Sequence, residues 1–362
     1  MKNHFIEFDI EDQKIYWIPV ELYEAIDYLK REEKLLGIIF TDNELKIVEI
    51  EDYFDIKYEN ILRKNLTIIL DTNVFIAARS LYKYHNINTT ERKYFASLLA
   101  YSMFLDSKLD TTICMYEIGN KHNHKASDDL YKFRVVDHLS LDTVLNLLNE
   151  KIKIVSKTHW EQAINRTREL NESEKNEDYN KSLDRFKQNY PYILKTTILL
   201  RMKGISPYDK IDLFFRWIKE KFITKTDAIT FSLFILFKDG GQIIKNHSTI
   251  IYSDIIKSIK NATWDVTMIS YLKDQAKKDP DRYFLFASDD KNLISAGKYF
   301  LSADGGILNL FGNKRRYEVQ NIIDKVNEIC NLPGREKIVE ERLLNIDKII
   351  IELENELNDS FK

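Results

Sequence analysis

Two apolar segments that run directly into acidic turns constrain the fold more than any other feature of the chain. The sequence LTIIL at 66–70 is continuous, apolar and rich in strand-favouring residues, and DTN follows it at 71–73. The sequence YFLFAS at 283–288 has the same character, and two aspartates follow at 289–290. Such runs are typical of strands buried on both faces of a parallel sheet. The chain is therefore predicted to be an α/β protein in which both acidic turns lie at one edge of a parallel sheet.

Helical periodicity dominates the rest of the chain. The sequence contains only ten Gly and five Pro, so long regular elements are expected rather than long loops. The N-terminal part alternates strand-like patterns with a helix expected over 21–36, and it forms either a module of its own or an elaboration of the core. The predicted organisation is an N-terminal α+β module (1–62), an α/β core (63–120 and 246–316), a mainly helical insertion (121–245) and C-terminal helices (317–362).

The segment after Pro333 and Gly334 is predicted to be one long helix. Its apolar residues recur every three or four positions, as in a heptad seam, and they are Val339, Leu343, Ile346, Ile350, Leu353 and Leu357. The seam is too short for a typical coiled coil, so it either docks on its own domain or contacts a second copy of the chain. The second alternative predicts a homodimer through the C-terminal helix.

Composition argues against several other classes of protein. No stretch reaches the roughly 20 apolar residues of a membrane span, and the acidic, mixed N-terminus lacks the pattern of a signal peptide. Cys114 and Cys330 are the only cysteines, which disfavours a disulfide framework and a cysteine zinc site. Neither a GxGxxG nor a Walker-type glycine loop occurs, which disfavours a dehydrogenase or a nucleotide-binding enzyme. We expect a cytoplasmic protein without membrane association.

The acidic residues after the two strands suit a divalent metal. Asp71 and Asp290 follow their strands at the point where open α/β sheets form ligand sites. Carboxylate oxygens are ligands that Mg²⁺ and Mn²⁺ prefer. Alternatively, each aspartate only caps the next helix by accepting hydrogen bonds from its first amides. The net charge of −3 does not indicate a nucleic-acid-binding protein, although a metal site of this kind is itself acidic.

The sequences around these aspartates resemble two motifs of the PIN-domain nucleases. TIILDTNVFI resembles the first motif, where it places Asp71, and FLFASDDKNL resembles the last, in which Asp290 matches the metal ligand. Asp289 stands where the family has Asn, so both neighbouring carboxylates are candidate ligands. The family's second carboxylate is a Glu on a helix, and CMYEIGN places Glu117 there.

The third family carboxylate has two candidates. The family pattern is an Asp that opens a helix shortly before the last strand, and Asp265 in NATWDVTMISYLKD fits it. Asp227 in TKTDAITFSLFILF also resembles the motif, but a long segment would then precede the last strand. Asp265 is therefore preferred. The resemblance covers residues 63–120 and 245–315, which leaves the helical insertion between them outside it.

Other residues are candidates for contacts with substrate. They form two groups, one beside the motifs and one in a basic cluster: Thr72, Asn73 and Ser288, and Lys314, Arg315 and Arg316. The first group could hydrogen-bond a ligand carboxylate or a phosphate, or only complete the turns. The second could hold phosphates, or be an ordinary solvated charge run. Lys121, close after Glu117, could also contact phosphate, and Trp264 could stack on a base or belong to the core.

The resemblance implies a PIN-like α/β core and an enzyme that hydrolyses RNA phosphodiester bonds with Mg²⁺ or Mn²⁺. Asp71, Glu117, Asp265 and Asp290 would bind the metal ions, with Asp289 as an additional candidate. Among relatives, this chemistry serves bacterial toxin–antitoxin systems, RNA processing and defence against phages, and a protein inhibitor is a partner that such a role implies. Two alternatives remain open: a structure-specific DNA nuclease, and a non-catalytic RNA-binding or scaffold protein with a PIN-like core.

Overall fold

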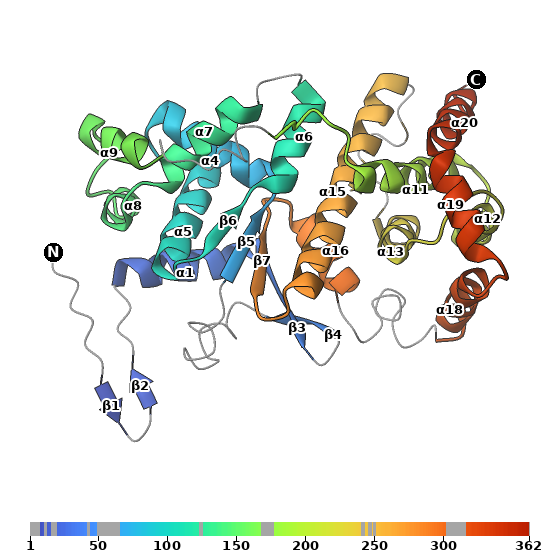
Figure 1. The fold of residues 1–362 in the computed structure, drawn as a ribbon, viewed down its shortest axis with the longest axis horizontal. Helices are drawn as coiled ribbons and strands as arrows, with labels where there is room; N and C mark the ends of the chain where they lie inside the picture. The colour runs from blue at the N-terminus through green and yellow to red at the C-terminus, as the bar shows by residue number, and fades with distance from the viewer. Residues whose placement is uncertain are drawn as a thin grey trace.

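The computed structural model shows an α/β protein in which a central sheet is flanked by helices (Figure 1). It describes residues 8–10, 13–15, 20–41, 44–48, 66–122, 126–167, 177–239, 243–244, 248, 251–301 and 316–361. No helix in these ranges is both long enough and apolar enough to cross a bilayer.

The central sheet is mixed and has five strands in the order β4-β3-β7-β5-β6. The strands are β3 (Leu35–Thr41), β4 (Glu44–Val48), β5 (Leu66–Leu70), β6 (Lys108–Asp110) and β7 (Tyr283–Ala287). The two apolar runs become β5 and β7, which lie side by side in parallel, and β6 is parallel to β5. The α/β class is thus confirmed. The predicted parallel arrangement holds for β7, β5 and β6 at the centre, whereas β3 runs antiparallel to both β7 and β4, so the sheet is mixed.

The N-terminal part contributes directly to this sheet. Helix α1 (Val20–Glu32) ends earlier than the helix expected over 21–36, because Leu35 and Leu36 already belong to β3 and pair with β7. β3 and β4 therefore elaborate the core instead of standing apart from it. The short strands β1 (Phe8–Ile10) and β2 (Gln13–Ile15) form a separate antiparallel pair.

One group of helices packs beside β5 and β6. It comprises α4 (Thr72–Tyr84), α5 (Thr90–Phe104), α6 (Thr112–His122), α7 (Ala126–Asp137), α8 (Leu141–Leu148) and α9 (Lys157–Thr167). Figure 1 shows α4, α5, α7, α8 and α9 on the left of the sheet and α6 above it. Its interior contains stacked rings of Phe75 and Phe133, 5.2 Å apart. The first part of the expected insertion, α7 to α9, thus packs on the helices α4 and α5 that follow β5.

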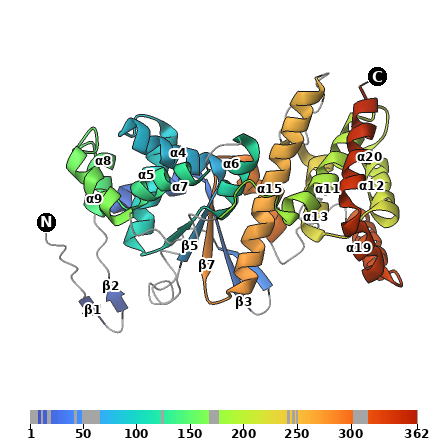
Figure 2. The same cartoon turned by 45° about the horizontal axis from the view of Figure 1, so that its top comes forward.

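A second group lies on the other side, beyond the long helix α15 (Tyr252–Lys278) (Figures 1 and 2). It comprises α11 (Asp184–Arg201), α12 (Pro207–Lys221), α13 (Thr226–Phe234), the π-helical turn η1 (Ile235–Asp239), α18 (Arg316–Cys330), α19 (Arg335–Leu344) and α20 (Ile346–Asp359). Helix α16 (Lys291–Leu301) follows β7 and packs on β3. The segment predicted as one insertion is therefore divided between two helical groups.

The C-terminal segment folds back on its own chain. The prediction of one long helix was wrong, because the helix breaks at Asn345 between α19 and α20. Leu353 and Leu357 of the heptad seam are buried, and α20 packs on α11. The ammonium of Lys187 on α11 lies 2.8 Å from the carboxylate of Asp347 on α20. These contacts support the docked alternative for the seam.

Candidate metal centre

A cavity of about 540 Å³ opens where β5 and β7 end, and the first residues of α4, part of α6 and one face of α15 line it. Its walls carry five carboxylates, and four of them come from four parts of the chain, namely Asp71, Glu117, Asp265 and Asp290. We call this the acidic cavity. The four residues proposed from the sequence as metal ligands are thus brought together, although Glu117 and Asp265 are separated by most of the helical insertion.

Asp71 is held at the junction of β5 and α4. One carboxylate oxygen accepts a hydrogen bond from the Thr72 amide at 2.7 Å, so Asp71 is the N-cap of α4. The other accepts a hydrogen bond from the Ser288 hydroxyl at 2.7 Å. The side chain is almost fully buried. Capping and lining the cavity are therefore not alternatives, because the same carboxylate does both.

Ser288 links the two aspartates that follow the strands. Its fully buried hydroxyl donates to Asp71 and accepts a hydrogen bond from the Asp290 amide at 3.0 Å. The Asp290 carboxylate accepts from the amides of Asn292 and Leu293, at 2.8 and 3.3 Å, and thereby caps α16. Both carboxylates are thus fixed by the local structure of a strand that turns into a helix.

Glu117 reaches the cavity from α6 and lies against α4. The Thr72 hydroxyl donates to one of its oxygens at 2.5 Å. The Lys121 ammonium, one turn along α6, forms an ion pair with the other oxygen. Thr72 therefore connects Asp71, through its amide, with Glu117, through its hydroxyl. This is the orienting role that the sequence left open for it.

Asp265 lies in the middle of α15, not at its start. The expectation that it opens a helix was wrong, because no Pro or Gly interrupts the sequence from Tyr252 onward and the helix continues through it. Its competitor Asp227 does open a helix, α13, but its carboxylate forms an ion pair with Lys273 at 2.6 Å. Asp227 does not line the acidic cavity, which favours Asp265 as the third carboxylate.

Burial and mutual repulsion disfavour the ionised carboxylates in this cavity. Burial, and then the charge of Glu117, raise the pKa of Asp71 to about 7 despite the hydrogen bonds from Ser288 and Thr72. Burial, followed by the charges of Asp71 and Glu117, raises the pKa of Asp265 well above its usual range. A cation placed between these groups would relieve the repulsion.

The donor set fits a hard divalent cation in kind, since every candidate ligand is a carboxylate oxygen. Within the described ranges, however, no three acidic, histidine or cysteine side chains converge into a finished metal site. In the structure, Glu117 is paired with Lys121, and Asp71 accepts a hydrogen bond from Ser288. Hydrogen bonds of this kind orient carboxylates that would hold a metal ion.

Other residues proposed from the sequence have mixed outcomes. Asp289 does not line the acidic cavity. Its carboxylate forms an ion pair at 2.6 Å with Lys34, the residue just before β3. Asn73 is exposed and lines the cavity. Trp264 is buried and packs on Phe186, with ring centroids 4.5 Å apart. The core interpretation therefore holds for Trp264.

The basic cluster falls outside the described structure. Lys314 and Arg315 are not among the described residues, and Arg316 begins α18 with a side chain that is not described. Conversely, the structure adds cavity residues that the sequence argument missed. On α15 these include Asp254, Lys257, Ser258 and Asn261, which share a helical face with Asp265. Their spacing of three or four residues was visible in the sequence, but not which way that face points.

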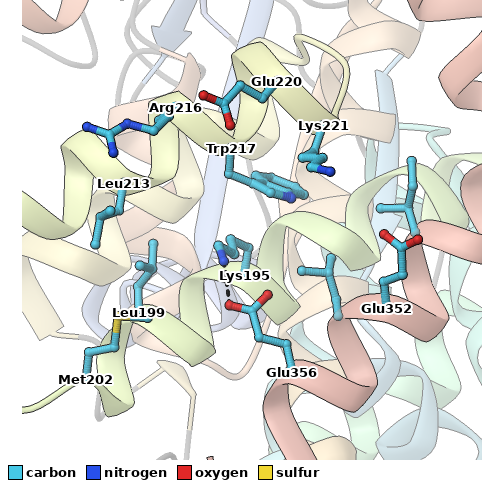
Figure 3. Close-up of a pocket in the computed structure, with 12 residues that line it drawn as sticks. Lys195, Leu199, Met202, Leu213, Arg216, Trp217, Glu220, Lys221, Glu352 and Glu356 are labelled. Carbon is cyan, nitrogen blue, oxygen red and sulfur yellow. Dashed lines mark hydrogen bonds and ion pairs between the residues drawn. The ribbon is translucent and has the colours of Figure 1, made fainter.

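A second cavity, of about 300 Å³, lies between α11, α12 and α20 (Figure 3). Its walls combine apolar side chains such as Trp217 and Leu199 with charges that are partly paired, since Lys195 and Glu356 form an ion pair at 2.6 Å. Its three carboxylates, Glu220, Glu352 and Glu356, are matched by three cations, Lys195, Arg216 and Lys221, so negative charge is not in excess there. The acidic cavity is therefore the candidate functional site. Comparison of the chain with protein-family models, with curated proteins and with solved structures gives no match.

Proposed function

We propose that this protein is a metal-dependent endonuclease of the PIN-like kind that hydrolyses RNA phosphodiester bonds. The observation that carries this proposal is that Asp71, Glu117, Asp265 and Asp290 line one cavity at the carboxyl ends of two parallel strands. These four carboxylates are the residues that the resemblance selects. Mg²⁺ or Mn²⁺ is the cofactor that such a donor set would hold.

The chemistry divides between the metal and the chain. A bound Mg²⁺ or Mn²⁺ supplies activation of water and stabilisation of charge on the phosphate. The chain supplies orientation, because Ser288 and Thr72 fix the carboxylates through hydrogen bonds of 2.5 to 3.0 Å. Lys121 balances the negative charge of Glu117 and lines the same cavity, where its ammonium would be a contact for substrate phosphate.

The test is cleavage of labelled single-stranded RNA and DNA by the purified protein in Mn²⁺, Mg²⁺ or EDTA. Asp71→Asn and Asp290→Asn should abolish metal-dependent cutting of RNA and the rise in melting temperature on adding Mn²⁺. Asp289→Asn is the matched control, since its carboxylate pairs with Lys34 instead of lining the cavity. Equal activity in Asp290→Asn and Asp289→Asn would contradict the proposal.

The same experiment separates the alternatives. Cutting of DNA alone, lost in the same variants, would make the protein a DNA nuclease with the same metal centre. Absence of cutting and of any Mn²⁺-dependent melting shift would favour a binding or scaffold protein. RNA is proposed as substrate because of the resemblance, and the four carboxylates act on a phosphodiester in either polymer.

A further inference from the structure

The acidic cavity contains cationic side chains that hydrolysis by a metal centre does not require. Lys257 on α15 and Arg79 on α4 both line it, together with the neutral polar side chain of Asn261. Lys257 is exposed, and it forms no ion pair with a described residue. An exposed ammonium beside a cluster of carboxylates is available for a ligand that carries negative charge.

The two cations reach the cavity from different helices, each at a distance along the chain from a carboxylate of the cavity. Lys257 precedes Asp265 by eight residues within α15, and Arg79 follows Asp71, the N-cap of α4, by eight residues. At a rise of 1.5 Å per residue, each separation corresponds to about 12 Å along its helix. Each cation is therefore about two helical turns away from a carboxylate that lines the same cavity.

The charge at each end differs. Arg79 pairs with Asp129, and Lys132 approaches the same carboxylate at 3.6 Å, so two cations share one anion at that end. At the other end, Asp254 precedes Lys257 by one turn and also lines the cavity. The negative charge of Asp254 offsets Lys257 without forming an ion pair with it. Lys257 is thus the cation with the most freedom to meet a phosphate.

The described walls of the cavity contain no aromatic side chain. Proteins that bind single strands through their bases stack them on aromatic rings, whereas contacts to phosphate carry no sequence information. The half-exposed Ile76 offers an apolar surface but no stacking platform. A strand in this cavity would therefore be held through its backbone.

On the basis of the proposed function, we infer that a single nucleic-acid strand crosses the acidic cavity from Lys257 to Arg79. The scissile phosphate lies over the carboxylates, and Lys257 is a positioning residue for a phosphate two helical turns away from them. Because the strand contacts a cation on each side of the scissile phosphate, the bond that is cut is internal. Recognition is by phosphate charge, so binding depends strongly on salt and little on base identity.

The test is binding of a labelled 12-nucleotide strand in Ca²⁺, measured by fluorescence anisotropy over a series of NaCl concentrations. RNA and DNA strands of uridine or thymidine, and of adenosine, distinguish the polymers and the bases. Gel analysis confirms that the strand stays intact. Lys257→Ala should raise the Kd by about 3- to 10-fold and reduce the slope of log K against log salt by about 0.7, the value for one phosphate contact.

Lys260→Ala is the matched control, because Lys260 is an exposed lysine of the same helix that does not line the cavity. It should leave both the Kd and the salt slope unchanged. A Lys257→Ala protein that binds like the wild type overturns the inference, and so does a wild-type protein that binds no strand. Cleavage and the Mn²⁺ melting shift report separately on the metal centre. If wild-type cleavage and the Mn²⁺ melting shift are observed while Lys257→Ala binds the strand normally, the proposed strand path is contradicted and the proposed nuclease function is retained.

Discussion

Carboxylates at the sheet edge and carboxylates in the second group of helices, around α11, differ in whether each has a cation as partner. We call this second group the helical layer. In the helical layer, each of several carboxylates has its own cation: Asp227 has Lys273, Asp347 has Lys187, and Glu356 has Lys195. Among the carboxylates that line the acidic cavity, only Glu117 has an ion-pair partner within the described residues, namely the ammonium of Lys121.

This difference separates structural from functional charge. A carboxylate that is paired with a cation helps to hold its helix in place, and its negative charge is already neutralised by that cation. Burial, and then the charges of the neighbouring carboxylates, raise the pKa of Asp71 and of Asp265 in the cavity. Unfavourable electrostatics concentrated at one site indicate a ligand that relieves them. The predictions below test this contrast.

The largest effect should be on how stability depends on pH in EDTA. Native Asp71 keeps its proton up to about pH 7, whereas in the unfolded chain it ionises near its ordinary pKa of 3.8. Between these values the native state binds more protons, so the free energy of unfolding falls as pH rises, by up to about 4 kcal/mol. Asp71→Asn should flatten this slope, measured by urea unfolding at pH 5.5 and pH 8.

Asp289→Asn controls for the loss of a neighbouring charge and should keep the slope. Mn²⁺ binds the ionised form, so its stabilising effect on the wild type should be larger at pH 8 than at pH 5.5. An Asp71→Asn protein whose stability depends on pH as in the wild type would show that the raised pKa of Asp71 is not the cause of this dependence.

The next effect compares one carboxylate from each region. Asp265→Asn removes a candidate ligand from the cavity and should lower metal-dependent cleavage by at least about 100-fold, as expected for loss of a group that stabilises transition-state charge. Asp227→Asn removes a structural partner of Lys273 and should change cleavage by less than about 2-fold once folding is matched. The measurement is single-turnover cleavage of RNA. Equal losses would erase the distinction between Asp265 and Asp227.

The residues that the sequence located best are those whose roles are local. Asp71 and Asp290 each end a buried strand and cap the following helix, and both features are encoded within a few residues. Glu117 came from the resemblance, and its contact with Thr72 joins elements 45 residues apart. Asp265 was identified, but its place in α15 was not, because the start of that helix lies well before the motif.

Features that depend on packing could not be read from local patterns. The strand patterns of β3 and β7 contain nothing that specifies their antiparallel pairing. The break at Asn345 interrupts an unbroken apolar periodicity without Gly or Pro. It is accompanied by long-range contacts, since Arg342 on α19 donates to the Glu220 carbonyl at the end of α12 at 2.7 Å. Such contacts exist only once distant helices meet.

A smaller effect should come from Lys121, the cation of the cavity that is paired with Glu117. Lys121→Met removes the ammonium that occupies Glu117. With this competitor gone, Mn²⁺ should bind several-fold more tightly, up to about 10-fold, or about 1.4 kcal/mol. Isothermal titration calorimetry at pH 8 gives the affinity directly, and Lys260→Met is the control. Weaker Mn²⁺ binding in Lys121→Met would mean that the ammonium organises the ligands instead of competing with the metal.

The smallest effect should come from an ion pair of the helical layer. The side chains of Lys187 and Asp347 are 34% and 73% exposed, so water and salt screen their attraction. Lys187→Ala should therefore lower the free energy of unfolding by about 0–1 kcal/mol and leave cleavage unchanged. Urea unfolding at low and high salt, with Lys348→Ala as an exposed-lysine control on α20, measures this contribution. A loss above about 2 kcal/mol would show that docking of α20 on α11 depends on this ion pair. The paired carboxylates would then contribute strongly to stability, and the contrast drawn here with the acidic cavity would not hold.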